Sequence, residues 1–272
     1  LARWIWLFTK HSTKRHVSNT QELLRDLSLE SRRLHVELSK NENFPLIQKG
    51  LLMLCQSNAG LEEEAKVAEE AHTLGLEAEV CDQNRLKELE PNAQINAKGG
   101  IWWPQDCHLS PEDFIQALRD SILQNGGEFT LGEVEKLEAD HRKVKNVITK
   151  SGEIYSAETI VLAGGIDTTE LVKQVGLTLP MQGGKGYSVT LPEPIANPLL
   201  CSLLKEGRVA VTPMGGTLRV SGTMEICGTD TSVSKRRLRG VLEAFCKFYP
   251  QYSPSDFENL EPWVGLRPCS PD

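Results

Sequence analysis

One arginine stands in a setting that suggests ligand binding. Arg267 belongs to the stretch Gly265-Leu266-Arg267-Pro268, where an apolar segment that predicts a strand ends at a proline. A guanidinium group is planar and binds a carboxylate through two parallel hydrogen bonds. Arg267 is therefore a candidate for binding a carboxylate ligand, and an ordinary ion pair with an acidic residue of the chain is the alternative.

A pair of glycines follows a short apolar run. Residues 159–163 favour a buried parallel strand, and Gly164 and Gly165 come directly after it, before a helix expected over about 168–175. Bare backbone at such a turn lets a ligand approach, and doubly wound folds bind nucleotides at the carboxyl ends of strands. A tight strand–helix turn without a ligand would give the same pattern.

The remaining motifs are weaker. The loop 102–108 holds two tryptophans, Asp106 and His108, which could line a pocket or lie at a polar surface. Residues 126–138 indicate only β-structure. The sequence contains no GxGxxG, GxxxxGK[ST], GxSxG or HExxH. No pyrophosphate loop can therefore be assigned, and no residue is assigned a catalytic or metal-binding role.

The composition restricts the class of protein. The 272 residues carry a net charge of −7, and a nucleic-acid partner, which requires a basic face, is not expected. No run of 18 apolar residues occurs. The seven cysteines form no CxxC pair, which favours reduced, buried thiols. The apolar start, residues 1–8, is expected to form a buried helix, and a position at a membrane surface is the alternative.

The apolar periodicities predict a mixture of helices and strands without a regular βαβ alternation. That order favours an α+β fold, with an antiparallel sheet and helices joined to part of a doubly wound domain. Helices are expected over 18–39, 61–74, 82–89, 110–124, 168–175 and 234–248. Strands are expected over 50–55, 77–81, 99–103, 128–131, 134–139, 143–149, 153–155, 159–163, 185–191, 208–212, 217–224 and 257–266.

Several of these stretches, taken in order, resemble one family. The chain is similar to the FAD-dependent D-amino-acid dehydrogenases, within the glycine oxidase and D-amino-acid oxidase superfamily, over nearly all of its length. Each motif is modest, but their joint order and spacing are specific. The matching segments are 48–52, 99–101, 104–106, the strand from Val134, 160–165, 184–188, 209–212, 219–226 and 263–272.

The resemblance implies roles for individual residues. Arg267 and Tyr187 are the substrate-binding candidates: Arg267 matches the arginine that binds the substrate carboxylate, and Tyr187 lies in a segment, with Lys185 and Gly186, that enters the substrate sheet near the flavin. Val134 matches a residue whose backbone meets the adenine end of FAD. Three residues match the strand and turn beside the adenosine, namely Ala163, Gly164 and Gly165.

The resemblance also implies an activity and a domain organisation. Hydride transfer from a D-amino acid to FAD would give an imino acid, which hydrolyses to a 2-oxo acid and ammonia. Residues 1–105 are expected to form the helical and β part of the substrate domain, 106–180 a remnant of the FAD-binding domain, and 181–272 the antiparallel sheet. The doubly wound domain would be incomplete, because both ends resemble cuts, and the fragment alone is expected to be inactive and not to retain FAD.

Two positions depart from the family pattern. Ala210 stands where some oxidases have an active-site tyrosine, and Cys107 stands where glycine is common.

Two other functions are alternatives to a D-amino-acid dehydrogenase. They are a related oxidoreductase acting on sarcosine, glycine, hydroxyproline or a 2-hydroxy acid, and a non-catalytic subunit that has lost FAD. A quinone or another respiratory-chain acceptor is a family-level expectation, as is a cytoplasmic location with peripheral binding at the inner face of the membrane.

Overall fold

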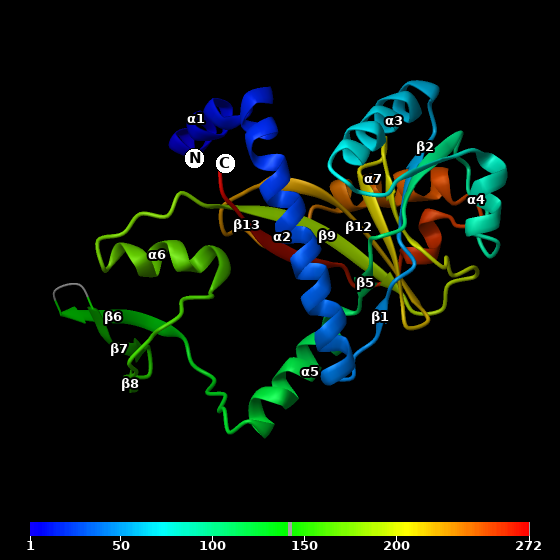
Figure 1. Ribbon diagram of the computed structural model, residues 1–272. Helices are drawn as coiled ribbons and strands as arrows, with labels where there is room; N and C mark the ends of the chain where they lie inside the picture. The colour runs from blue at the N-terminus through cyan, green and yellow to red at the C-terminus, as the bar shows by residue number, and fades with distance from the viewer. Residues whose placement is uncertain (141–142, 272) are drawn as a thin grey trace.

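The computed structural model describes residues 1–140 and 143–271, and Asp272, the last residue of the final matching segment, lies outside them (Figure 1). A large sheet with its helices forms the main body, and a smaller β-structure lies to one side. The helices are α1 (Ala2–His11), α2 (Lys14–Asn41), α3 (Asn58–Thr73), α4 (Gln83–Leu89), α5 (Pro111–Gln124), α6 (Thr168–Lys173) and α7 (Lys235–Phe248), with two 3-10 turns, η1 (Gly165–Asp167) and η2 (Pro254–Phe257).

The main sheet has eight strands in the order β13-β9-β12-β11-β10-β2-β4-β3. Every neighbouring pair is antiparallel except β10 and β2, which are parallel. This architecture confirms the α+β fold class. The strands are β2 (Leu51–Cys55), β3 (Glu79–Cys81), β4 (Gly99–Trp103), β9 (Gln182–Leu191), β10 (Cys201–Leu204), β11 (Val209–Met214), β12 (Thr217–Ile226) and β13 (Trp263–Cys269).

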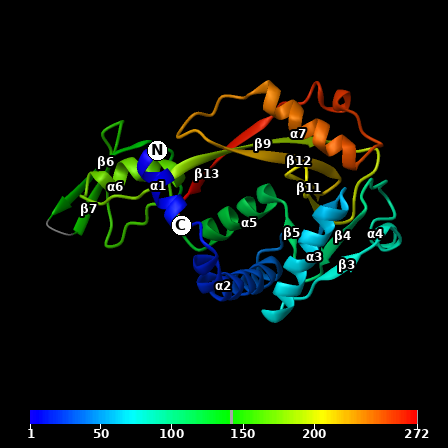
Figure 2. The ribbon, with the colours of Figure 1, turned by 90° about the horizontal axis from the view of Figure 1, so that it is seen from above.

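The two faces of this sheet have different coverings. Helix α7 packs on one face, where Val241 and Phe245 join the apolar side chains of β11 and β12 in the core. Seen from above, α5 and α2 lie on the opposite side of the sheet from α7 (Figure 2). On the face turned away from α7, strand β9 presents small or polar residues at alternate positions, namely Gly184, Gly186 and Ser188.

A second, three-stranded sheet consists of β6 (Val134–Asp140), β7 (Lys143–Thr149) and β8 (Ile154–Ser156), paired in that order. It forms a separate lobe with α6 (Figure 1). The side chain of Gln174, just after α6, accepts a hydrogen bond from Leu137 N and donates one to Glu135 O. These two bonds attach α6 to β6. A short pair, β1 (Leu46–Ile47) with β5 (His108–Leu109), connects the regions near α2 and α5.

Local sequence signals place several elements correctly. Helix α5 begins at Pro111 behind Ser110, whose hydroxyl accepts from Asp113 N, and Asp82 caps α4 in the same way. Both caps satisfy backbone N–H groups that have no partner inside the helix. The predicted boundaries of these two helices agree with the structure to within one residue.

Three expectations about individual elements are wrong, and one strand was not expected. Residues 159–163 form no strand, and the side chain of Val161 is 81% exposed. A parallel strand needs neighbours to bond its backbone, and the described residues supply none beside this segment. Residues 128–131 also lack a strand, and the last strand begins at Trp263 because η2 occupies the region around Phe257. Strand β10 is an element that the sequence pattern does not predict.

The apolar N-terminal segment is helical but not buried. Helix α1 has no buried residue, and Trp6 is largely exposed. Its tertiary hydrogen bond runs from Trp4 Nε1 to the backbone oxygen of Cys269, at the end of β13. The expectation of a buried helix is therefore wrong, because the apolar residues of α1 point in several directions and the described chain covers only part of them. None of the helices in the described residues is both long and apolar enough to cross a membrane.

Candidate functional site

Arg267 lies on the face of the sheet turned away from α7. In the register of β13 against β9, Arg267 is opposite Gly184 and Gly265 is opposite Gly186. The guanidinium lies over Gly186, because a Cβ built on that glycine would be 2.6 Å from Arg267 Nη1. A side chain at position 186 would therefore collide with the guanidinium, and the glycine leaves room for the arginine against the strand.

The guanidinium of Arg267 is unpaired. Within residues 1–140 and 143–271 it has no hydrogen bond and no ion pair, and the residue is exposed. A structural ion pair, the alternative to ligand binding, is therefore not what the described chain contains. An exposed, unpaired guanidinium held against bare backbone is suited to binding an anion such as a carboxylate.

Two apolar side chains flank this arginine. The indole of Trp263 lies over Gly265, within 2.2 Å of where a Cβ would stand, and the side chain of Met224 lies over Gly184. Trp263 is 66% exposed and Met224 is 63% exposed. Because Gly265 and Gly186 are register partners, the indole and the guanidinium cover neighbouring positions of the sheet. The surface thus combines a cation with apolar contact area.

Tyr187 lies on the opposite face from Arg267. Side chains alternate along a strand, and Tyr187 is buried on the α7 side, where its register partner Gly222 packs against Val241. The hydroxyl of Tyr187 donates to Glu225 Oε2 at 3.1 Å. The structure therefore does not bring Tyr187 and Arg267 to one binding surface, although the family resemblance implies that both contact the substrate.

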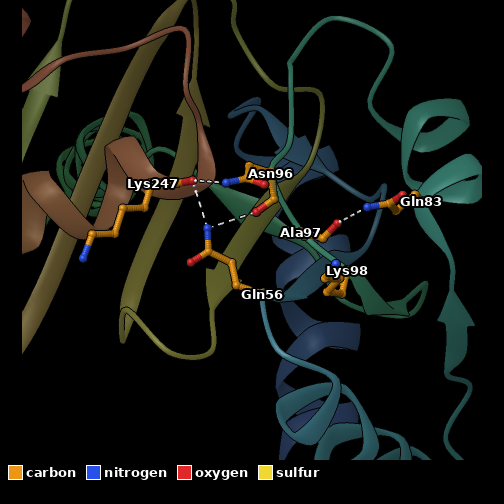
Figure 3. Close-up of a pocket in the computed structure, with 6 residues that line it drawn as sticks. All are labelled: Gln56, Gln83, Asn96, Ala97, Lys98 and Lys247. Carbon is orange, nitrogen blue, oxygen red and sulfur yellow. Dashed lines mark hydrogen bonds between the residues drawn. The ribbon is translucent and has the colours of Figure 1, made fainter.

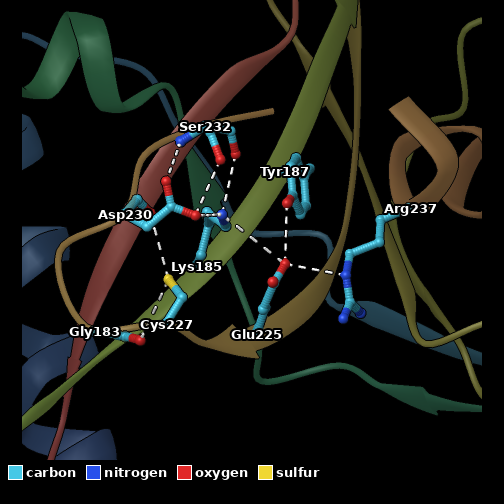
Figure 4. A network of polar contacts seen from close by, with 8 residues as sticks. All are labelled: Gly183, Lys185, Tyr187, Glu225, Cys227, Asp230, Ser232 and Arg237. Atoms are coloured by element: carbon cyan, nitrogen blue, oxygen red, sulfur yellow. Dashed lines mark hydrogen bonds and ion pairs between the residues drawn. The ribbon is translucent and has the colours of Figure 1, made fainter. Parts of the chain in front are cut away.

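The cluster around Tyr187 contains charges that sequence reasoning missed (Figure 4). Lys185 Nζ is buried and donates to Asp230 Oδ2 at 2.7 Å and to the backbone oxygen of Ser232. The hydrogen bond with Asp230 raises the pKa of Lys185, and it lowers the pKa of Asp230 to about 2 together with bonds from Ser232. Arg237 Nε meets Glu225 Oε2 at 3.0 Å. The sequence feature that could have indicated this cluster is the position of Lys185 within a glycine-rich, buried strand.

The glycine turn predicted to lie beside the cofactor contacts the strand that carries Arg267. Gly165 opens η1, which packs against β13. Gly165 has φ of +58°, a conformation that favours glycine, and a Cβ there would meet nothing within 4 Å. Ala163 and Gly164 are exposed as well. This open, bare backbone fits the approach of an adenosine group.

Val134, the other residue expected to meet the cofactor, is the first residue of β6. It is half-buried and is the register partner of Thr149. The contact between α6 and β6 connects its strand to the glycine turn, since α6 follows η1 directly.

The loop 102–108 lines a cavity, which lies away from Arg267. A space of about 580 Å³ between α2, α5 and β5 is bordered by Arg32, Cys107 and His108, among others. Burial lowers the pKa of His108 and raises that of Cys107. Ala210, the other departure from the family pattern, is half-buried in β11. Neither position adds a titratable group beside Arg267.

A second cavity, of about 380 Å³, lies near β4, several strands away from β13 along the sheet (Figure 3). Its polar groups bond to one another: Gln56 Nε2 donates to the backbone oxygens of Asn96 and Lys247, and Gln83 Nε2 donates to that of Ala97. These bonds link α7, the start of α4 and the chain before β4. None of the predicted site residues lies in this cavity.

Comparisons with known proteins agree with this architecture. The family model described as DAO, FAD dependent oxidoreductase, matches residues 4–272. The chain belongs to this family of FAD-dependent oxidoreductases, as its resemblance to D-amino-acid dehydrogenases indicated.

The similar proteins share its sequence or its fold. A D-amino acid dehydrogenase of Paramagnetospirillum magneticum is 31% identical over all of this chain and 66% of its own length. One of Vibrio atlanticus is 30% identical over 88% of this chain and 58% of its own length. The crystal structure of glycine oxidase from Geobacillus kaustophilus has a TM-score of 0.78 at 23% identity, over 90% of this chain and 67% of that one. The chain thus spans less than two thirds of the length of the curated relatives it matches.

Proposed function

We propose that this chain supplies the substrate-binding face of an FAD-dependent enzyme that oxidises a D-amino acid to an imino acid. The unpaired guanidinium of Arg267, which lies against Gly186, is the observation that supports this proposal. The substrate carboxylate binds Arg267 through two hydrogen bonds, which fixes the direction of the Cα–H bond. Orienting the substrate in this way lowers the activation free energy by several kcal/mol, in order of magnitude.

The apolar neighbours of Arg267 suit the rest of an amino acid. A carboxylate bound at the guanidinium leaves the substrate side chain within reach of Met224 or Trp263, both of which are exposed. The curated relatives named above are D-amino acid dehydrogenases, which favours D-amino acids over the sarcosine, glycine and hydroxyproline alternatives. Turnover of a panel of these compounds distinguishes the substrates.

The residues present fit FAD at the adenine side. The exposed backbone of Ala163, Gly164 and Gly165 would lie beside the adenosine, and the backbone of Val134 would meet the adenine end. When bound, FAD supplies the acceptor for the hydride that leaves the substrate Cα. The division into a substrate domain, 1–105 and 181–272, and a part of the FAD-binding domain, 106–180, rests on this assignment. A quinone or another respiratory carrier is the proposed final acceptor.

Substitution of Arg267 by leucine tests the proposal in the protein that contains this chain. We expect Arg267→Leu to raise KM for a D-amino acid by at least about 100-fold, since it removes two hydrogen bonds and bonds to charged groups contribute roughly 1.5–3 kcal/mol each. Arg236 on α7 is exposed and has no ion pair among the described residues, so Arg236→Leu is the matched control. Kinetics unchanged by Arg267→Leu would remove Arg267 from the site.

A further inference from the structure

A β-bulge lies directly opposite the glycine that supports Arg267. In the pairing of β12 with β9, Gly222 is opposite Tyr187 and Glu225 is opposite Lys185. Two residues of β12, Thr223 and Met224, therefore face the single residue Gly186 of β9. An extra residue of this kind bends the strand, and bulges are frequent beside active sites.

The bulge holds a strained backbone. Thr223 has φ of +65°, in the left-handed region that β-branched residues rarely adopt. Its carbonyl oxygen would lie 3.6 Å from a Cβ on Gly186, so it occupies the same side of that glycine as the Arg267 guanidinium. Such a conformation is unfavourable and persists only where the surrounding structure enforces it.

The hydroxyl of Tyr187 provides one such restraint. Tyr187 is the register partner of Gly222, before the bulge, and its hydroxyl binds Glu225, after the bulge. The side chain thus connects the two ends of the distorted segment on the face opposite Arg267. Figure 4 shows the Tyr187 hydroxyl and Arg237 converging on the same Glu225 carboxylate.

The loop after β12 is fixed by the same cluster. Lys185, 2% exposed, is the register partner of Glu225, lies 4.0 Å from its carboxylate and binds Asp230 and Ser232. The segment from Glu225 to Ser232 therefore has attachments on β9 and on α7. The two bulge residues lie between Gly222 and these attachments. The backbone oxygen of Thr223 and the side chain of Met224 are on the surface that carries Arg267.

We propose that Tyr187 and Glu225 are positioning residues, whose hydrogen bond across the bulge holds Thr223 and Met224 in place and thereby sets the position of the Arg267 guanidinium. This inference rests on the proposed function, because it assigns the cluster a role in binding the substrate carboxylate. It gives Tyr187 an indirect role, in place of the direct substrate contact that the family resemblance implied.

Binding of propionate to the holoenzyme containing this chain tests the inference without turnover, because propionate has a carboxylate but no oxidisable amine. Titration calorimetry with Tyr187→Phe is expected to show affinity weakened by about three- to tenfold, less than the direct loss of a hydrogen bond to a charged group, because the Tyr187 bond acts on the ligand only through Arg267. Tyr155→Phe, which removes an exposed hydroxyl on β8, is the matched control and should bind like the parent. Propionamide, which is uncharged, should show no such difference.

A double substitution separates this inference from the proposed function. If Tyr187 acts through Arg267, then Tyr187→Phe has no further effect on propionate affinity in the Arg267→Leu background. Glu225→Gln, which keeps an acceptor oxygen, should retain more affinity than Glu225→Ala. Normal propionate affinity in Tyr187→Phe and Glu225→Ala, with the loss confined to Arg267→Leu, would overturn the positioning role and leave the proposed function intact. Undiminished affinity in Arg267→Leu would instead overturn the proposed function.

Discussion

Gly186→Ala is the smallest change that should disturb the proposed carboxylate site. The added Cβ would stand 2.6 Å from Arg267 Nη1, where ordinary contact begins at 3.4 Å, so the guanidinium must move by about 0.8 Å to reach ordinary contact. The colliding atom is the end of a flexible side chain, so the shift itself requires little energy. A displacement near 1 Å lowers the rate by up to about 100-fold when it misplaces a group that orients the substrate. We therefore expect kcat/KM for a D-amino acid to fall by about 10- to 100-fold.

The assay compares steady-state kinetics with thermal unfolding for the same variant. Gly186 lies inside a strand and has no positive φ, so alanine fits its backbone and the unfolding temperature should change little. Gly240→Ala on α7 is the control, because its Cβ would meet nothing within 4 Å and should stabilise the helix by about 1 kcal/mol. Full activity in Gly186→Ala, together with normal propionate affinity, would show that the position of the guanidinium over Gly186 is not functional.

Three further predictions concern Met224, Asp230 and the binding of FAD by the chain. Met224→Ala should lower kcat/KM for D-leucine more than for D-serine. The difference should be about fourfold for each methylene group that no longer packs against the substrate. Equal reductions for both substrates would contradict packing of Met224 against the substrate side chain. Asp230→Asn should reduce the unfolding temperature at pH 7, because the pKa of Asp230 is lowered from 3.8 to about 2 and its contribution is present above pH 4. The difference should shrink as pH falls from about 4 toward 2, and a constant difference across that range would argue against the Lys185 pair. The 272-residue chain alone, which has no GxGxxG loop, should bind little FAD, and a stoichiometric flavin spectrum would contradict this.

Elements with local signals were predictable from the sequence. Ser110 with Pro111, and Asp82 before α4, define helix starts through contacts within a few residues. Strand β10 lacks such a signal, because its parallel pairing with β2 joins residues about 150 positions apart, such as Cys201 and Leu51. The apolar run 159–163 has the composition of a buried strand, although burial depends on neighbours that its own residues do not specify.

The candidate site was partly predictable, because some of its residues have local sequence signals and others depend on pairing between distant strands. Arg267 has a distinctive local context, and its unpaired state fits the expectation of a ligand. The separation of Tyr187 and Arg267 onto opposite faces follows from the register of β9 with β13, and a shift of one residue would reverse it. The bulge at Thr223 depends on the pairing of β12 with β9 and on the contacts of Glu225. For that reason, no local sequence pattern predicts it.

The glycines beneath Arg267 are best explained by the side chains that cross them. A glycine within a strand is destabilising by roughly 0.5–1 kcal/mol relative to alanine, and this region has Gly184, Gly186 and Gly265 on one face. A Cβ at these positions would meet Cys269, Arg267 and Trp263 respectively, each within 2.6 Å. The apolar core lies on the other face and gains nothing from their small size. The unfavourable glycines therefore serve the exposed surface, where they leave room for a cation and an indole beside each other, and this arrangement has a clear use only if something binds there.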